Sequence, residues 1–171
     1  MRATYEVYAG GVTILQLEAE FDVTPAGYRL MTVARTRGLA ATFVPGEQAA
    51  RVVGEWAGMA ARPVAYGTDG VWRGRVRRTV GREVILPWRE AWHGPALRCA
   101  FEGRLVAGFR LSQQRADTTP QRGTAWVASP FAGAPPIPVR VEVPSRWFGQ
   151  AVAVMLRAEL SAPGVAGQQV R

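Results

Sequence analysis

Apolar and polar residues alternate along residues 15–23, where Leu, Ala, Phe and Val occupy every second position and Gln, Glu or Asp lie between them. A period of two is typical of a β-strand with one buried and one solvated face. Another strand-like segment, residues 4–8, precedes it across Gly10 and Gly11, and a glycine pair supplies the positive φ angles of a tight turn. The pattern therefore predicts an antiparallel hairpin at the start of the chain.

Similar short segments, separated by proline and glycine turns, continue along the chain. They predict strands at residues 28–37, 49–56, 62–66, 71–80, 83–86, 125–128, 138–143 and 151–160. Residues 87–95 fit a loop, and residues 96–109 fit a hairpin that turns at Glu102 and Gly103. The last strand also has the composition of a helix, but its turn-rich neighbours favour a strand.

These elements predict an all-β protein: an antiparallel meander curled into a barrel or half-barrel, with little helix. A chain of 171 residues fits a single domain with a core of its own. We expect this domain at residues 4–160. Residues 161–171 are small and polar, with a proline and glycines, and predict a disordered tail.

The formal net charge is +8, and all 21 basic residues are arginine. The chain has neither lysine nor asparagine, whose codons are AT-rich, so a GC-rich genome accounts for much of the arginine content. Charge alone is therefore weak evidence for a nucleic-acid partner, and we do not expect one.

One basic feature is organised, a predicted stripe of Arg73, Arg75 and Arg77 on one strand face. Such a stripe could bind an anionic surface through phosphate contacts. It could equally form an ordinary solvated face paired with glutamates on the neighbouring strand.

The residues that catalysis and metal binding require are scarce. Cys99 and His93 are the only cysteine and histidine, which excludes an internal disulfide and a four-ligand Cys/His zinc site. No serine lies in a Gly-x-Ser-x-Gly turn, and no phosphate-binding glycine loop is found. Glu18 and Glu20 share a strand face, but their polar neighbours are typical of a solvated surface. We expect a non-enzymatic protein without catalytic residues, metal or cofactor.

The aromatic residues near predicted strand ends and turns are the candidates for ligand binding. They are Trp56, Tyr66, Trp72, Trp88 and Trp92. Large rings at such places either close a small β core or line the mouth of a cavity, and the sequence supports both interpretations.

The longest uncharged run, residues 123–139, contains four prolines, which a membrane-spanning helix does not tolerate. We therefore expect no transmembrane segment. The first residues lack the apolar stretch of a signal peptide, so the sequence as written predicts a cytoplasmic protein.

Several short motifs occur in an order that resembles a known family. They are YEVYAGG at residues 5–11, ARTRGL at 34–39, WRG at 72–74, GPALRC at 94–99, VAGF at 106–109, PIPVR at 136–140 and WFG at 147–149. The chain from residue 4 to about residue 160 thus resembles a proteobacterial envelope family known only as a domain of unknown function. The resemblance implies an antiparallel β domain of the periplasm or cell envelope, with no established activity and no catalytic residue to carry over. Compared with that family, the chain looks shortened around residues 79–83.

Three functions are open at this point. The first is an envelope β domain that binds an apolar or amphipathic, lipid-like ligand inside a curled sheet. The second is a structural or interaction module that docks an envelope protein through a sheet edge or the proline-rich residues 130–138. The third uses the arginine stripe to bind anionic lipid or nucleic acid. The predicted architecture and the family resemblance favour the first.

Overall fold

The computed structural model describes residues 1–43, 46–57, 60–67, 71–107, 120–145 and 149–160, and these ranges hold ten strands and one short helix. The elements are β1 (Arg2–Ala9), β2 (Val12–Thr24), β3 (Gly27–Thr36), α1 (Gly38–Phe43), β4 (Glu47–Ala57), β5 (Ala60–Gly67), β6 (Val71–Ile85), β7 (Gly94–Ala107), β8 (Gln121–Ala128), β9 (Ile137–Ser145) and β10 (Gly149–Glu159). The predicted all-β class with little helix is confirmed.

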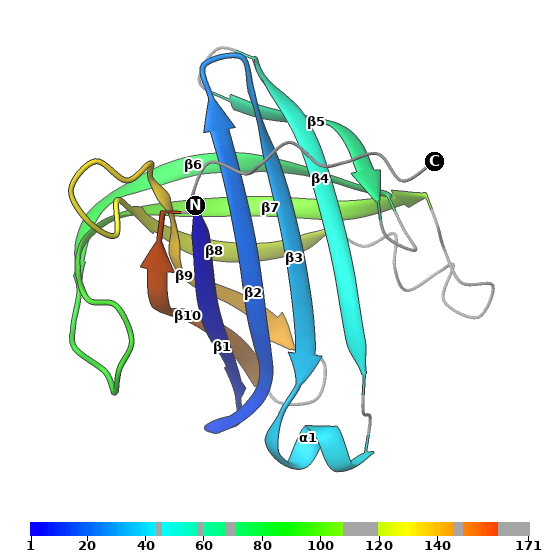
Figure 1. The fold of residues 1–171 in the computed structure, drawn as a ribbon, viewed down its shortest axis with the longest axis vertical. Helices are drawn as coiled ribbons and strands as arrows, with labels where there is room; N and C mark the ends of the chain where they lie inside the picture. Colours follow the sequence, from blue (N-terminus) through cyan, green and yellow to red (C-terminus); the bar gives the residue numbers. More distant parts are fainter. Residues whose placement is uncertain (44–45, 58–59, 68–70, 108–119, 146–148, 161–171) are drawn as a thin grey trace.

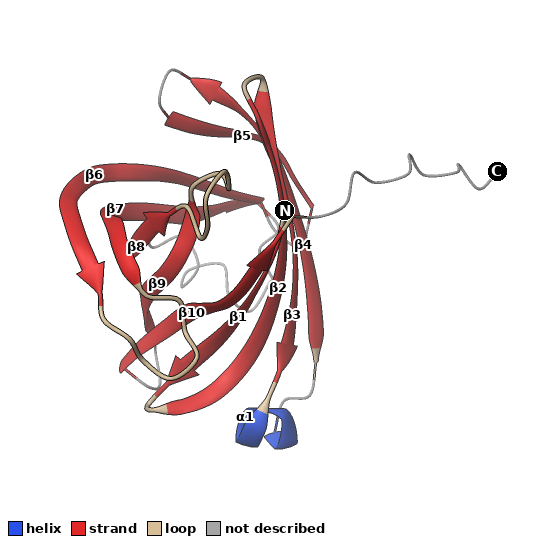
Figure 2. Cartoon of the chain, turned by 60° about the vertical axis from the view of Figure 1, so that its left-hand side comes forward, coloured by secondary structure: helices blue, strands red, loops and turns tan. Residues whose placement is uncertain are grey.

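All ten strands belong to one antiparallel sheet with the order β5-β4-β3-β2-β1-β10-β9-β8-β7-β6. Two meanders run outward from the centre, where the first strand of the chain pairs with the last. In Figure 1, β1 to β4 stand upright in front, while β6, β7 and β8 cross behind them. The sheet curls, as Figure 2 shows from the side, but its edge strands β5 and β6 are not hydrogen-bonded to each other. The fold is therefore a half-barrel.

The predicted hairpin at the start of the chain is confirmed. Gly10 and Gly11 join β1 to β2 with φ angles of 57° and 82°, the left-handed values that two-residue hairpin turns require. The last predicted strand is confirmed as well, because β10 pairs with β1 on one side and with β9 on the other. The predicted tail, residues 161–171, lies outside the described residues.

Two predicted boundaries are wrong. Residues 96–109 do not turn at Glu102 and Gly103, because both residues pair with β6 on one side and with β8 on the other, inside the continuous strand β7. The predicted strands 71–80 and 83–86 are likewise one strand, β6, which passes through Gly81 at φ 146° with a shift in register. A glycine inside a strand marked an irregularity here, not an end.

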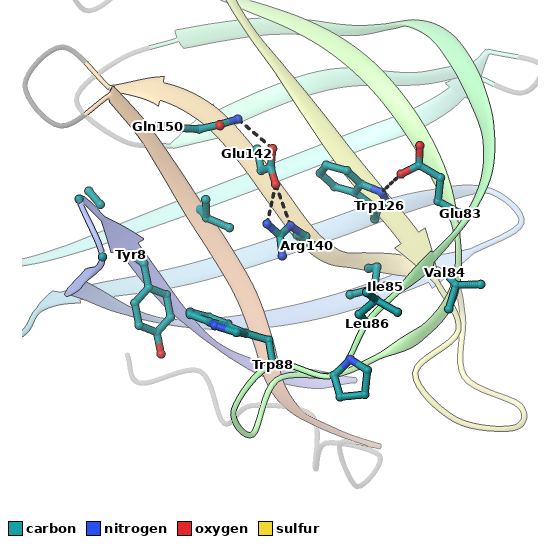
Figure 3. A pocket seen from close by; sticks show the side chains of 15 residues that line it. Tyr8, Glu83, Val84, Ile85, Leu86, Trp88, Trp126, Arg140, Glu142 and Gln150 are labelled. Atoms are coloured by element: carbon teal, nitrogen blue, oxygen red, sulfur yellow. Dashed lines mark hydrogen bonds and ion pairs between the residues drawn. The ribbon is translucent and has the colours of Figure 1, made fainter.

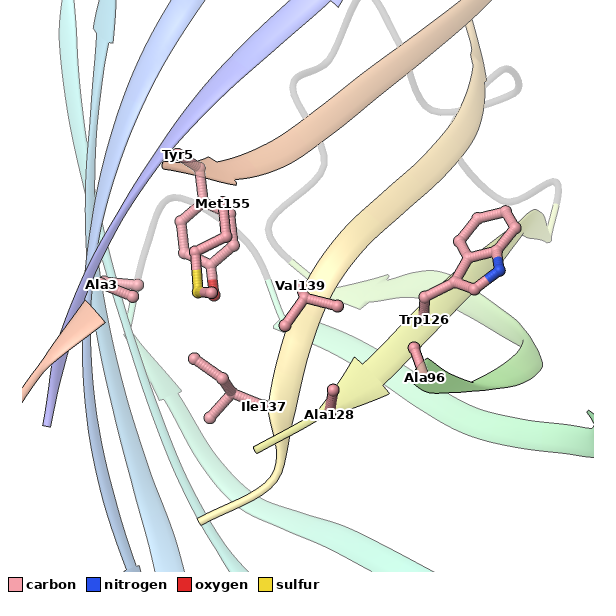
Figure 4. Packing of buried hydrophobic residues seen from close by; sticks show 9 residues of the cluster. Ala3, Tyr5, Ala96, Trp126, Ala128, Ile137, Val139 and Met155 are labelled. Atoms are coloured by element: carbon pink, nitrogen blue, oxygen red, sulfur yellow. The ribbon is translucent and has the colours of Figure 1, made fainter. Parts of the chain in front are cut away.

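The core lies where the central strands face β9. Figure 4 shows Ala3 and Tyr5 of β1 and Met155 of β10 with Ile137 and Val139 of β9, all of them buried. The Tyr5 hydroxyl donates a hydrogen bond to the Pro138 carbonyl at 2.8 Å, so its one polar atom is satisfied. Burial raises the pKa of Tyr5 well above its usual range.

Glu18 and Glu20 lie on the solvated face of β2, as predicted. Arg35 of β3 bridges Glu18, at 2.7 Å, and Glu47 of β4, at 2.6 Å. Glu20 pairs with Arg2 on β1. All these side chains are substantially exposed, so they form a charged cross-strand surface that contributes little to stability.

We predict that Gly123→Ala destabilises the fold. A Cβ at Gly123 would lie 2.5 Å from Cζ of Phe101 on β7 and 2.7 Å from the backbone oxygen of Glu142 on β9. The Phe101 ring can move, but the oxygen belongs to the ladder between β8 and β9. Overpacking of this kind costs about 1–3 kcal/mol in the free energy of unfolding, which urea denaturation would measure.

The matched control is Gly46→Ala. An added Cβ at Gly46 meets nothing within 4 Å, and its φ is not left-handed. This variant should unfold at the same urea concentration as the wild type. Equal midpoints for both variants would show that the approach of Phe101 and β9 to Gly123 is not required.

Candidate functional site

A cavity of about 570 Å³ opens at one side of the half-barrel. The end of β6 and the connection that follows it form one wall, and strands β8, β9 and β10 with the turn between β1 and β2 form the other (Figure 3). Side chains from both meanders therefore meet in it.

The wall at the end of β6 is apolar and exposed. Val84 is 68% exposed, Leu86 75% and Trp88 40%, and all three line the cavity. Ile85, between the first two, also lines the cavity and packs against the core cluster. Exposed apolar side chains that gather in this way are typical of a binding surface.

The connection behind this wall is anchored to the central strands. Ala91 is buried against Tyr8 and Val154, and the Trp92 backbone N–H donates to the Met155 carbonyl at 2.8 Å. The Trp92 indole N–H reaches the Pro130 carbonyl at 3.3 Å. The apolar wall is thus held in place by the residues that follow it.

An aromatic pair stands where this wall meets β1. The rings of Tyr8 and Trp88 contact edge to face, with centroids 4.7 Å apart and planes at 74°. The Arg89 guanidinium lies 5.2 Å from the Tyr8 ring centroid and 4.9 Å from that of Trp88. The Tyr8 hydroxyl donates to Glu6, and burial together with this bond raises the pKa of Tyr8.

Two carboxylates line the cavity, Glu83 on β6 beside the apolar side chains and Glu142 on β9. We call these two residues and their donors the polar wall, and Glu83 is the first of them. Its Oε2 accepts a hydrogen bond from the Trp126 indole N–H at 2.9 Å, and its Oε1 accepts one from Arg98 at 3.0 Å. These donors, Trp126 before Arg98, hold the pKa of Glu83 below its usual value. The Trp126 ring lies between two guanidiniums, 5.4 Å from Arg98 and 5.5 Å from Arg140.

Glu142 of β9 is the second carboxylate. Its Oε1 accepts hydrogen bonds from the Arg140 guanidinium, at 2.8 Å from Nε, and its Oε2 accepts one from the Gln150 amide at 2.8 Å. Each carboxylate therefore has one arginine and one uncharged N–H donor, on different oxygens. The strand register brings these groups together. Trp126 on β8 pairs with Arg98 on β7 and with Arg140 on β9, and Glu142 on β9 pairs with Val152, two positions after Gln150 on β10.

Among the described residues, no group of three or more His, Cys, Asp or Glu side chains could hold a metal ion. In the same part of the chain, no helix is long and apolar enough to cross a membrane. His93 is exposed in the connection after β6, and Cys99 is buried in β7.

The five predicted aromatic residues do not converge on one place. Trp88 lines the cavity, Trp92 packs against the core, and Trp56 lies at the end of β4, where it donates to the Thr24 carbonyl. The backbones of Tyr66 and Trp72 lie in β5 and β6, but their side chains are outside the described part of the structure.

The arginine stripe also falls on side chains that the structure does not describe. The backbones of Arg73, Arg75 and Arg77 lie in β6. The register of β6 with β7 shifts between Val76 and Arg78. Binding of anionic lipid or nucleic acid by these residues stays a prediction.

Sequence reasoning missed most of the cavity. Tyr8, Glu83, Glu142 and Gln150 come from four strands and share no motif. Nothing in the sequence around Trp126 indicates that Glu83, 43 positions earlier, accepts its indole hydrogen bond. Only the pairing of β1 with β10 and the register from β10 to β6 bring these residues together.

Comparisons with known proteins do not assign this chain to a family. No protein-family model matches the chain, and no curated protein is similar to it. A solved structure from Parabacteroides distasonis ATCC 8503, titled a "putative lipoprotein", is similar in shape, with a TM-score of 0.46 and 10% sequence identity over 91% of this chain and 92% of that one. A likeness at this level leaves the function open.

We predict that the bond between Trp126 and Glu83 survives acidification to below the ordinary pKa of a glutamate, about 4.3. Because the pKa of Glu83 is lowered, its contribution to stability is fully present at neutral pH and is lost as the pH falls through that lowered value. Tryptophan fluorescence of the wild type minus that of Glu83→Gln isolates the transition. A fluorescence difference whose midpoint lies at or above pH 4.3 would contradict the prediction.

Proposed function

We propose that this domain binds an apolar or amphipathic, lipid-like ligand in the cavity between β6 and strands β8 to β10. The exposed apolar wall of Val84, Leu86 and Trp88 carries the proposal. Burying apolar surface is favourable by about 25 cal/mol per Å², so a ligand that covers these side chains gains affinity from each of them.

The size and lining of the cavity support the same function. Its volume of about 570 Å³ lies within the range of small-molecule sites. One wall offers apolar side chains, and the other offers the bonded carboxylates of Glu83 and Glu142. A molecule with one apolar and one polar end would match both.

The proline-rich segment 130–138, the alternative docking site for a protein partner, already makes contacts within the domain. In the proline-rich segment 130–138, Ala134 and Ile137 are buried, and the Pro130 carbonyl accepts the bond from Trp92. The cavity wall is the more open surface, so we favour a small ligand over a protein partner. Location in the cell envelope is part of the proposal and rests on the family resemblance alone.

The test is native mass spectrometry of the purified protein after exposure to a bacterial lipid extract. We expect a discrete adduct that survives buffer exchange. Leu86→Ser should weaken retention about tenfold, because a buried leucine contributes about 1.5–3 kcal/mol. A clean ligand-free mass for the wild type would contradict the proposal.

Leu160→Ser is the matched control. Leu160 is 67% exposed, close to the 75% of Leu86, but does not line the cavity. This variant should retain the adduct like the wild type. Equal loss in both variants would mean that the ligand sits elsewhere on the surface.

A further inference from the structure

We infer that the polar wall of the cavity selects an uncharged headgroup rich in hydroxyl groups, on an amphiphile whose alkyl chain lies along the apolar wall. This inference rests on the proposed function and adds the class of ligand. It comes from the way in which the two carboxylates and their arginines balance each other.

The charges at the wall are already compensated. Glu142 takes hydrogen bonds on both oxygens, from Arg140 and Gln150. Glu83 repeats the pattern with Arg98 and Trp126. No net charge is left for a ligand to neutralise at either pair.

At the polar wall, a charged headgroup would therefore meet repulsion without compensation. An anion that approached Arg140 would also face Glu142, at hydrogen-bond distance from that guanidinium, and Glu83 across the cavity. A cation would compete with Arg140 and Arg98 for carboxylates that they already hold. Like charges brought together at a site reject the wrong ligand even where they add nothing for the right one.

Hydroxyl groups, in contrast, find acceptors at this wall. A carboxylate has about four lone-pair positions on its two oxygens, so Glu83 keeps acceptor capacity beyond its two bonds, and Glu142 keeps capacity on Oε2. The Gln150 amide adds a carbonyl oxygen at the cavity. Glycerol and sugar headgroups both supply such donors without charge.

The alkyl chain of such an amphiphile would lie on the apolar wall. This wall consists of every second residue from 84 to 88, namely Val84, Leu86 and Trp88, which line one side of the cavity. In Figure 3 the polar pairs of Glu83 and Glu142 lie above Leu86 and Trp88 in the view. An alkyl chain on the apolar wall would direct its headgroup toward these pairs.

The experiment compares four amphiphiles that share a dodecyl-length chain: monolauroylglycerol, dodecyl maltoside, laurate and dodecyltrimethylammonium. Isothermal titration calorimetry below each critical micelle concentration gives the affinities for the full chain. We expect both hydroxylated compounds to bind at least tenfold more tightly than laurate and the ammonium compound. The order of the first two distinguishes a glycerolipid from a glycolipid headgroup.

Glu142→Gln tests the charge balance itself. It removes one negative charge and leaves Arg140 uncompensated, while the contact of Arg140 with the Trp126 ring remains. Laurate should gain about tenfold in affinity, and monolauroylglycerol should change much less. Glu20→Gln is the matched control, because Glu20 pairs with Arg2 outside the cavity, and it should alter neither affinity.

The outcomes separate the two proposals. If none of the four compounds binds the wild type, the proposed function fails and the headgroup inference fails with it. If all four bind alike, or laurate or the ammonium compound binds best, the function stands and the inference is overturned. The wild-type series decides this even if Glu142→Gln does not fold.

Discussion

The pairing of β1 with β10 is the interaction on which the rest of the structure depends. In the described strands it is the one hydrogen-bonded ladder that joins the meander β1 to β5 with the meander β10 to β6. It brings Arg2 opposite Glu159, so nearly the whole chain must be closed into a loop before the ladder can form. Both the core and the cavity are built across this junction.

Alternation along β1 divides its side chains between the core and the cavity. Tyr5 lies in the main core cluster, while Tyr8 packs with Val154 and contacts Trp88 at the cavity. The two tyrosines are three positions apart, an odd spacing that places them on opposite faces of a strand. The partners on β10, Met155 and Val154, are neighbours in the chain and divide in the same way.

Local pattern predicted the fold class because each strand and hairpin turn has its own signal, as at Gly10 and Gly11. It failed inside long strands, where Gly81 and the Glu102-Gly103 pair resemble turns although neighbouring strands hold them extended on both sides. The cavity was less predictable still, because Glu83 and Trp126 meet only through the pairing of β6, β7 and β8. Of the predicted aromatic residues with described side chains, Trp88 alone lines it.

The strongly basic composition also gives a misleading picture of the cavity. The chain carries a net charge of +8, yet the arginines at the polar wall, Arg98 and Arg140, each face a carboxylate. The excess positive charge therefore lies outside the polar wall, as at Arg89 beside Tyr8 and Trp88, and it describes how the whole molecule meets a charged surface or solvent. What a ligand meets inside the cavity is set by the paired charges and by the exposed wall of Val84, Leu86 and Trp88. Partner chemistry inferred from total charge and chemistry inferred from the site need not agree, and for any molecule that enters the cavity the site decides.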